Sequence, residues 1–124
     1  MPRDAKTGHL TQGTISPIRK VPDQIARPEY VGKVAPAANT KGDVRTSAEI
    51  QLIRAAGKIA AQAIELVGSH AKPGITTDEL DHIGHEFLIS QGAYPSTLGY
   101  RGYPKSLCSS VNEVICHGIP DDTV

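Results

Sequence analysis

Two helix-start motifs, 30 residues apart, most constrain how this chain can fold. Thr46-Ser-Ala-Glu49 and Thr76-Thr-Asp-Glu79 each place a Thr hydroxyl three residues before a Glu, which is the capping-box pattern that opens an α-helix. Apolar residues recur at spacings of three and four after each box, until Lys72-Pro-Gly74 and Gln91-Gly92 end the pattern. The sequence therefore predicts two helices joined by a Pro-Gly turn.

One stripe of each predicted helix is expected to be buried, because its apolar members fall on one face. In the first helix the stripe consists of Ile50, Ile53, Gly57, Ala60, Ile64 and Val67. In the second helix it consists of Leu80, Ile83, Phe87 and Leu88.

Residues 1–45 form a different region. They hold five of the nine prolines and show no period of 2 or 3.6, so little apolar surface is available to offset the entropy of ordering. They also hold eight Lys or Arg against four Asp or Glu, whereas residues 46–124 hold five against nine. We expect an extended, mobile arm, whose positive charge favours contact with an anionic partner such as RNA.

The C-terminal third predicts a loop followed by a β-hairpin. Gly, Pro, Ser and Tyr dominate residues 94–104, which is typical of a loop. Ser106–Val111 and Val114–Ile119 then flank Asn112-Glu113, which predicts two strands and a tight turn. The expected fold class is α+β: an arm over 1–45, then two helices and a hairpin within 46–124.

Side-chain alternation would give this hairpin one apolar and one polar face. If Val111 pairs with Val114, Cys108 lies opposite His117 on the polar face. That register leaves open a cysteine hydrolase with Cys108 as nucleophile and His117 as base. A hydrogen-bonded packing pair is the alternative interpretation of the same two residues.

His82, His85 and Glu86 resemble a zinc motif only superficially. Zinc-peptidase helices space their histidines at i and i+4 with Glu next to the first, or use the inverted pattern, and this spacing is neither. We expect these residues on the solvated surface of the second helix. The two cysteines fit neither a zinc-ligand spacing nor a disulfide framework.

Three segments together resemble type I methionine aminopeptidases. They are Lys72-Pro-Gly-Ile-Thr-Thr-Asp-Glu-Leu-Asp81, Leu98-Gly-Tyr-Arg-Gly-Tyr-Pro-Lys-Ser106 and Val111-Asn-Glu-Val-Ile-Cys-His-Gly-Ile-Pro-Asp-Asp122. The arm, through Ile25-Ala-Arg-Pro-Glu-Tyr-Val-Gly-Lys33, is similar to the extension of actinobacterial members. The resemblance implies the N-terminal part of a pita-bread fold, and an enzyme that removes initiator methionine from nascent chains with a pair of divalent metal ions.

The resemblance also implies roles for individual residues. His117 matches the active-site histidine that assists the scissile amide, and is expected to be catalytic and to contact the substrate. Tyr100, Tyr103 and Cys108 match positions that line the methionine pocket, where aromatic walls and a sulfur contact suit a thioether. Thr97 stands where many relatives have cysteine, at the pocket rim. Asn112 and Val114 match positions whose carbonyls bind an auxiliary monovalent cation in some relatives.

The family's metal ligands are two Asp, a His and two Glu, and the resemblance places them beyond residue 124. Asp121 and Asp122 are therefore not expected to be ligands, and the chain alone should bind neither of the two ions, whether Co, Mn, Fe or Zn. Without metal-activated water, the chain alone should be nearly inactive. The expected partners are a nascent peptide with N-terminal Met, the ribosome through the arm, and the remaining part of the enzyme on a separate chain.

The cytoplasm is the expected location. The N-terminus carries charge but no apolar signal segment, and no long charge-free apolar run predicts a membrane span. A ribosome-associated binding module without catalysis stays open beside the aminopeptidase and cysteine-hydrolase interpretations.

Overall fold

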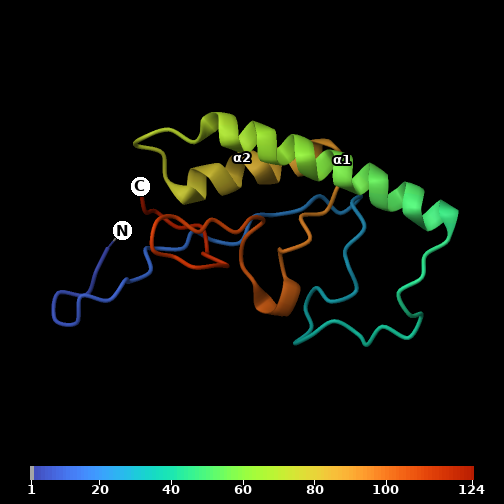
Figure 1. Ribbon diagram of the computed structural model, residues 1–124, viewed down its shortest axis with the longest axis horizontal. Coiled ribbons are helices and arrows are strands. Elements are labelled where there is room, and N and C mark those ends of the chain that lie inside the picture. Colours follow the sequence, from blue (N-terminus) through green and yellow to red (C-terminus); the bar gives the residue numbers. More distant parts are fainter. Residues whose placement is uncertain (1) are drawn as a thin grey trace.

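The computed structural model describes residues 2–124 and consists of two neighbouring α-helices above a layer of loops (Figure 1). Helix α1 spans Ser47–His70, α2 spans Thr77–Ser90, and the short 3-10 helix η1 spans Tyr100–Gly102. Within residues 2–124 the only β pairing is an isolated bridge between Arg3 and Leu10. No helix of the described chain has both the length and the apolar composition to cross a bilayer.

Both predicted helix starts are confirmed. The Thr46 hydroxyl accepts from Glu49 N at 3.2 Å, and Thr46 N donates to Glu49 Oε2 at 2.8 Å. The second box repeats this exchange between Thr76 and Glu79 at 3.1 and 2.7 Å. The backbone N–H of each cap lowers the pKa of its Glu. Gly74, with φ of +94°, makes the turn between the helices.

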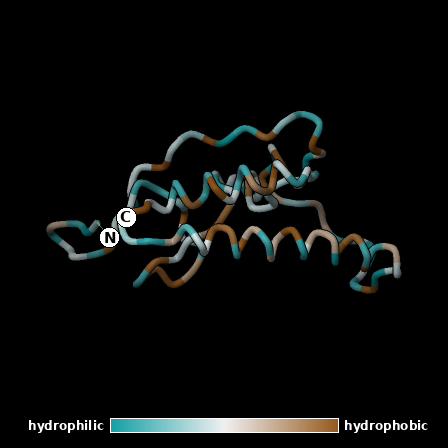
Figure 2. The backbone as a smooth tube through the Cα atoms, turned by 90° about the horizontal axis from the view of Figure 1, so that it is seen from above, coloured by the Kyte–Doolittle hydropathy of each residue, from teal (hydrophilic) through white to brown (hydrophobic). Residues whose placement is uncertain are grey.

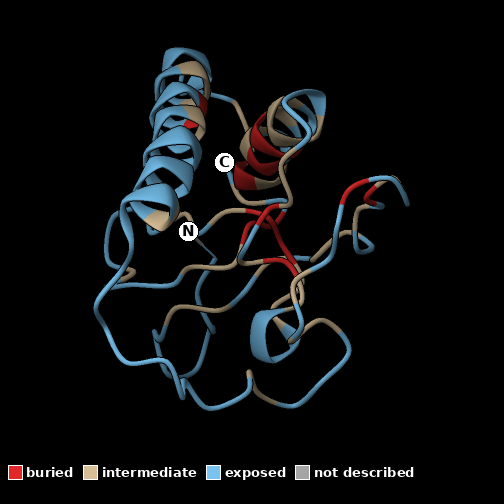
Figure 3. Ribbon diagram, turned by 90° about the vertical axis from the view of Figure 1, so that its right-hand side faces the viewer, coloured by how far each residue is buried: buried red, intermediate tan, exposed pale blue. Residues whose placement is uncertain are grey.

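Helix α1 is mostly exposed, so the prediction of a buried stripe along it is wrong. Ala63 is its one buried residue in the described structure, whereas Ile53 and Ile64 are 57% and 74% exposed. Figure 2 shows hydrophobic segments recurring along the whole helix, and Figure 3 shows the helix almost entirely exposed. The amphipathic pattern identified the helix correctly, but within residues 2–124 the contact with α2 leaves most of its apolar face uncovered.

The most buried face of α2 is polar rather than apolar. The predicted stripe is half-buried, and the buried residues are Thr77, Asp81, Gly84 and His85. His82 and Glu86 are exposed as expected, but placing His85 on the solvated surface was wrong, since it is 1% exposed. Its nitrogens contact Ser106 Oγ at 2.7 Å and Lys20 O at 2.9 Å, partners that helix periodicity does not reveal.

The middle of the arm packs against the rest of the chain. Val21 and Ile25 are 5% and 8% exposed and form a small apolar core with Leu98. Ile89 and Tyr94 pack against that core. Composition suggested an arm with too little apolar surface to pack, but this part of the arm is packed. Two apolar side chains, Val21 and Ile25, are enough to dock an irregular segment.

The predicted β-hairpin is absent from the described structure, and residues 106–119 form irregular loops. Ser109 N donates to Gly118 O at 2.9 Å, so the register that paired Cys108 with His117 is also wrong. Asn112 and His117 have φ of +53° and +49°, a left-handed conformation that strands do not use. The left-handed conformation of His117 interrupts the extended backbone that a strand over residues 114–119 would require.

Candidate functional site

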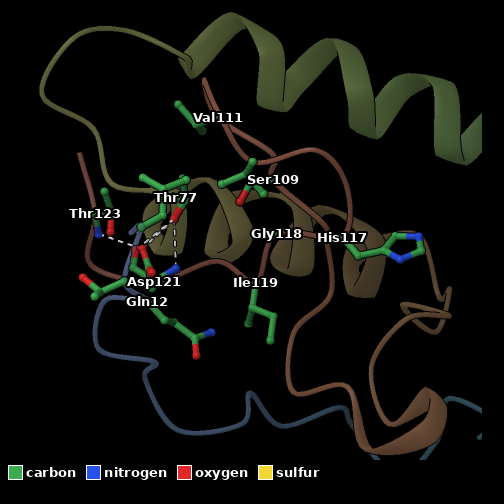
Figure 4. Close-up of a pocket in the computed structure, with 12 residues that line it drawn as sticks. Gln12, Thr77, Ser109, Val111, His117, Gly118, Ile119, Asp121 and Thr123 are labelled. Atoms are coloured by element: carbon green, nitrogen blue, oxygen red, sulfur yellow. Dashed lines mark hydrogen bonds between the residues drawn. The ribbon is translucent and has the colours of Figure 1, made fainter. Parts of the chain in front are cut away.

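Two neighbouring pockets share His117 and Ile119. The larger, which we call the tyrosine pocket, has a volume of about 770 Å³. It is lined by Tyr30, Ser96, Thr97, Tyr100, Arg101, Gly102, Tyr103, Pro104, Cys108, His117 and Ile119. The smaller pocket, of about 290 Å³, lies toward Thr77 and Asp121 (Figure 4).

All five residues expected to bind substrate line the tyrosine pocket. Thr97, Tyr100 and Tyr103 come from the loop around η1, whereas Cys108 and His117 come from the two loops that follow. Their convergence on one pocket does not require the predicted hairpin, which the described structure lacks. Their roles toward a substrate stay a prediction.

The loop that carries the tyrosines is held in shape by its own hydrogen bonds. Gly99 N donates to Tyr103 O at 2.8 Å, and the Thr97 hydroxyl donates to Lys105 O at 3.0 Å. Gly99 has φ of +84°, a conformation that costs glycine little. Leu98 is 4% exposed and fixes the loop to the core beneath. These contacts hold the pocket wall to the rest of the chain.

Tyr103 joins the two segments that carry Cys108 and His117. Its hydroxyl lies 2.8 Å from Leu107 O and 3.1 Å from Gly118 O, so these two carbonyls share its single proton as acceptors. Burial first, and then the neighbouring Cys108 thiol, raise the pKa of Tyr103 well above its usual range. Tyr103 therefore stays a neutral hydrogen-bond donor at physiological pH, and positions the backbone beside His117.

His117 and Cys108 are both exposed at the pocket. Figure 4 shows the His117 imidazole pointing away from Thr77 and Asp121. In residues 2–124 no hydrogen bond joins Cys108 to His117, and both cysteines have free thiols. The His117 ring is thus available to a group entering from solvent.

Asp121 has a structural environment in the smaller pocket. Its carboxylate accepts from Gly13 N at 2.7 Å and from Thr123 N at 2.9 Å, and its own N–H donates to the Thr77 hydroxyl at 2.9 Å. Partial burial works to raise the pKa of Asp121, but these hydrogen bonds hold it below its ordinary value. Asp121 thereby ties the arm and the last residues to the start of α2.

A buried ionic network fixes the loop that leads into Cys108. Asp81 is fully buried and accepts from Ser106 N and Leu107 N, both at 2.8 Å, and from Arg19 Nε at 3.1 Å. Asp78 accepts from Lys105 Nζ at 2.7 Å and pairs with Arg19 at 3.0 Å. Burial opposes ionisation of Asp78, but Lys105, Ser16 and Arg19 keep its pKa below its ordinary value.

Sequence reasoning missed Tyr30, which the fold brings from the arm to the pocket. Its ring meets Tyr100 edge-on, with centroids 5.2 Å apart and planes 82° apart. Tyr30 precedes Tyr100 by 70 residues, so no local spacing connects them. The signal available was the cluster Arg27-Pro-Glu-Tyr-Val31, an aromatic residue in a turn-forming context.

Within residues 2–124, no group of three or more His, Cys, Asp or Glu side chains is arranged to hold a metal ion. The residues present therefore do not fit a divalent metal site. Asn112 and Val114, expected to offer carbonyls to a monovalent cation, lie in the turn closed by Val114 N and Val111 O at 3.2 Å.

Comparison with known proteins decides the family. Residues 51–124 match metallopeptidase family M24. The chain belongs to this family. The M24 match covers α2, all of α1 after its first turn, and every residue of the tyrosine pocket except Tyr30.

Its relatives include several methionine aminopeptidases. The chain is 58% identical over 115 residues to methionine aminopeptidase 2 of Mycobacterium tuberculosis, covering 93% of this chain and 40% of that protein. It is 48% identical over 119 residues to methionine aminopeptidase 1D of Arabidopsis thaliana, covering 95% of this chain and 34% of that protein. The resemblance inferred from the three segments is confirmed. The chain spans about a third to two fifths of these relatives.

A solved structure supports the fold. The crystal structure of methionine aminopeptidase from Rickettsia prowazekii superposes with a TM-score of 0.63 at 43% sequence identity. The superposition covers 65% of this M24 chain and 33% of that chain. The expected pita-bread relationship and the two helices are therefore supported, whereas the hairpin is not.

Proposed function

We propose that this M24 chain is part of an aminopeptidase that removes the initiator methionine from nascent proteins by metal-dependent hydrolysis. The observation that carries the proposal is the convergence of Thr97, Tyr100, Tyr103, Cys108 and His117 on one pocket in a chain so similar to methionine aminopeptidases. In this proposal the tyrosine pocket receives the methionine side chain.

The pocket suits such a side chain. Tyr100 and Tyr103 offer apolar ring faces, and Cys108 offers a polarisable sulfur, which together complement an unbranched thioether. Thr97 lies at the rim, and its hydroxyl closes the loop through Lys105 O. His117, exposed at the pocket edge, contacts the scissile amide and stabilises the charge that develops on it.

The family name implies divalent metal, and the resemblance specifies two ions among Co, Mn, Fe and Zn. In this proposal residues outside the described ones would hold the ions, and the bound ions would supply activated water for hydrolysis. The carbonyls of Asn112 and Val114 remain our candidates for a monovalent cation at the turn before His117.

The proposed partners follow from this activity. They are a nascent peptide with N-terminal Met, the ribosome, contacted through the basic arm, and the remaining part of an M24 domain on a separate chain. The proposed location is the cytoplasm, where nascent chains emerge.

The test uses this chain together with the remaining part of an M24 domain, which we call the complete domain. Release of the N-terminal residue from Met-Gly-Met and from Leu-Gly-Met is compared before and after EDTA, and after returning Co, Mn, Fe or Zn. We expect selective cleavage of Met-Gly-Met that EDTA abolishes and one of these metals restores.

A Cys108→Ser variant separates the alternatives. Turnover by the aminopeptidase should remain within about tenfold, because a pocket thiol contributes contact rather than chemistry. If the chain were a cysteine hydrolase, the Cys108→Ser variant would lose turnover, whereas the wild type would keep its turnover in EDTA. A binding module without catalysis would release no methionine at all.

A further inference from the structure

We propose that Tyr30, in the N-terminal arm, is a specificity-determining residue of the tyrosine pocket, so that the arm helps select the side chain that enters. This inference rests on the proposed function. It adds to that function a residue outside the matched M24 region, contributed by a segment 66 or more residues away from the rest of the pocket.

The Tyr30 ring is fixed at both ends. Its edge-to-face contact with Tyr100 has a centroid distance of 5.2 Å, within the favourable range for aromatic pairs. Its hydroxyl donates to Ser96 O, on the loop that carries the other pocket residues. Burial raises the pKa of Tyr30, with smaller effects from Tyr94 and Tyr100, so the hydroxyl stays protonated at neutral pH.

The arm on both sides of Tyr30 contacts the rest of the chain. The side chain of Val31 packs over Gly99, since a Cβ placed on Gly99 would lie 3.4 Å from both Val31 Cγ atoms. Val21 and Ile25 are buried against Leu98 nearby, and Arg27 donates to Val21 O at 3.1 Å. The turn from Pro28 O to Val31 N, at 3.2 Å, then presents Tyr30 to the pocket.

The consequence for selectivity follows from what Tyr30 covers. Tyr100 is 42% exposed even with Tyr30 against it, so losing the Tyr30 ring would leave this wall of the pocket open to solvent. A slim thioether would then make fewer contacts, while a broader side chain such as Phe would gain room. Tyr30 thus acts on the choice between side chains rather than on the chemical step.

The experiment measures kcat and KM of the complete domain on Met-Gly-Met and Phe-Gly-Met for four forms: wild type, Tyr30→Ala, Tyr30→Phe and Lys33→Ala. Lys33 is exposed on the same arm and does not line the pocket, so it is the matched control. Tyr30→Ala should raise KM for Met-Gly-Met about tenfold, with kcat within about twofold. Tyr30→Phe keeps the ring and should keep selectivity, as should Lys33→Ala.

Limited proteolysis reports whether the arm stays docked in each variant. If Tyr30→Ala releases the arm, Tyr30→Leu replaces it in the kinetic comparison. Leu also removes the aromatic ring, but it keeps an apolar contact that holds the arm in place. The decisive quantity is the kcat/KM for Met-Gly-Met divided by that for Phe-Gly-Met. If this ratio is unchanged in Tyr30→Ala, or in Tyr30→Leu, while the arm stays docked, the role of Tyr30 is overturned and the proposed aminopeptidase function still stands. A wild-type complete domain that cleaves neither peptide would overturn both proposals.

Discussion

At the scale of single residues, His117 combines exposure with a constrained backbone. Its φ of +49° is held between the Ser109–Gly118 hydrogen bond and the Tyr103 hydroxyl on Gly118 O. A Cβ on Gly118 would meet Ser109 O and lie 2.9 Å from Ser109 C, so only glycine fits beside His117. This arrangement fixes the backbone at His117 while leaving its imidazole exposed at the pocket.

We predict that His117→Ala in the complete domain lowers turnover of Met-Gly-Met by about 100-fold or more, the usual scale for a lost acid-base or oxyanion contact. Metal content and thermal unfolding should match the wild type, because the side chain is exposed. Near-normal turnover, or loss of activity through misfolding alone, would show that the role of His117 is structural.

At the scale of elements, the contact between the arm and α2 depends on buried charge. Arg19 is 19% exposed and pairs with the fully buried Asp81 carboxylate. We predict that Arg19→Ala destabilises the complete domain by about 3 kcal/mol, because it leaves a buried carboxylate without its cation. Urea unfolding measures this free energy.

Lys33→Ala provides the comparison for Arg19→Ala, since the Lys33–Glu29 pair has side chains 60% and 49% exposed. It should change the free energy of unfolding by no more than about 0.5 kcal/mol. Equal effects of the two substitutions would mean that the Arg19–Asp81 pair is no stronger than a surface ion pair.

The same network predicts acid sensitivity. The pKa of Asp78 in the fold lies below its ordinary value of 3.8, so its contribution to stability is complete only above about pH 5. The contribution is lost as pH falls from about 5 through 3.8 and then through the lower folded pKa. Wild type should therefore lose more stability than Asp78→Asn between about pH 5 and 3; parallel curves would contradict this assignment.

The helices and the pocket residues could be predicted from sequence, but the packing partners could not. Capping boxes are local, so Thr46 and Thr76 marked both helix starts correctly. His85 was misplaced because its partners, Ser106 and Lys20, lie 21 and 65 residues away. The hairpin failed because hydropathy cannot report the positive φ at His117.

At the scale of the whole molecule, the apolar face of α1 stays mostly uncovered within the described residues. It borders a groove of about 990 Å³ lined by residues of α1, α2 and the loops that follow. Within the described chain the buried hydrophobic residues are only Val21, Ile25, Ala63 and Leu98. Such a small core barely offsets the entropy of ordering.

We predict that the 124-residue chain alone unfolds without a cooperative thermal transition and shows weak near-UV circular dichroism. Adding the remaining part of an M24 domain should restore both, because it offers apolar surface to α1. A sharp transition with native-like near-UV signal for this chain alone would contradict the prediction.

In the proposed function, the tyrosine pocket holds the methionine side chain beside His117. A crystal structure of the complete domain with bound L-methionine tests this most directly. We expect the thioether among Tyr100, Tyr103 and Cys108, with the methionine carboxylate on the His117 side. A methionine side chain bound outside this pocket, with Tyr100 and Tyr103 free of ligand, would contradict it.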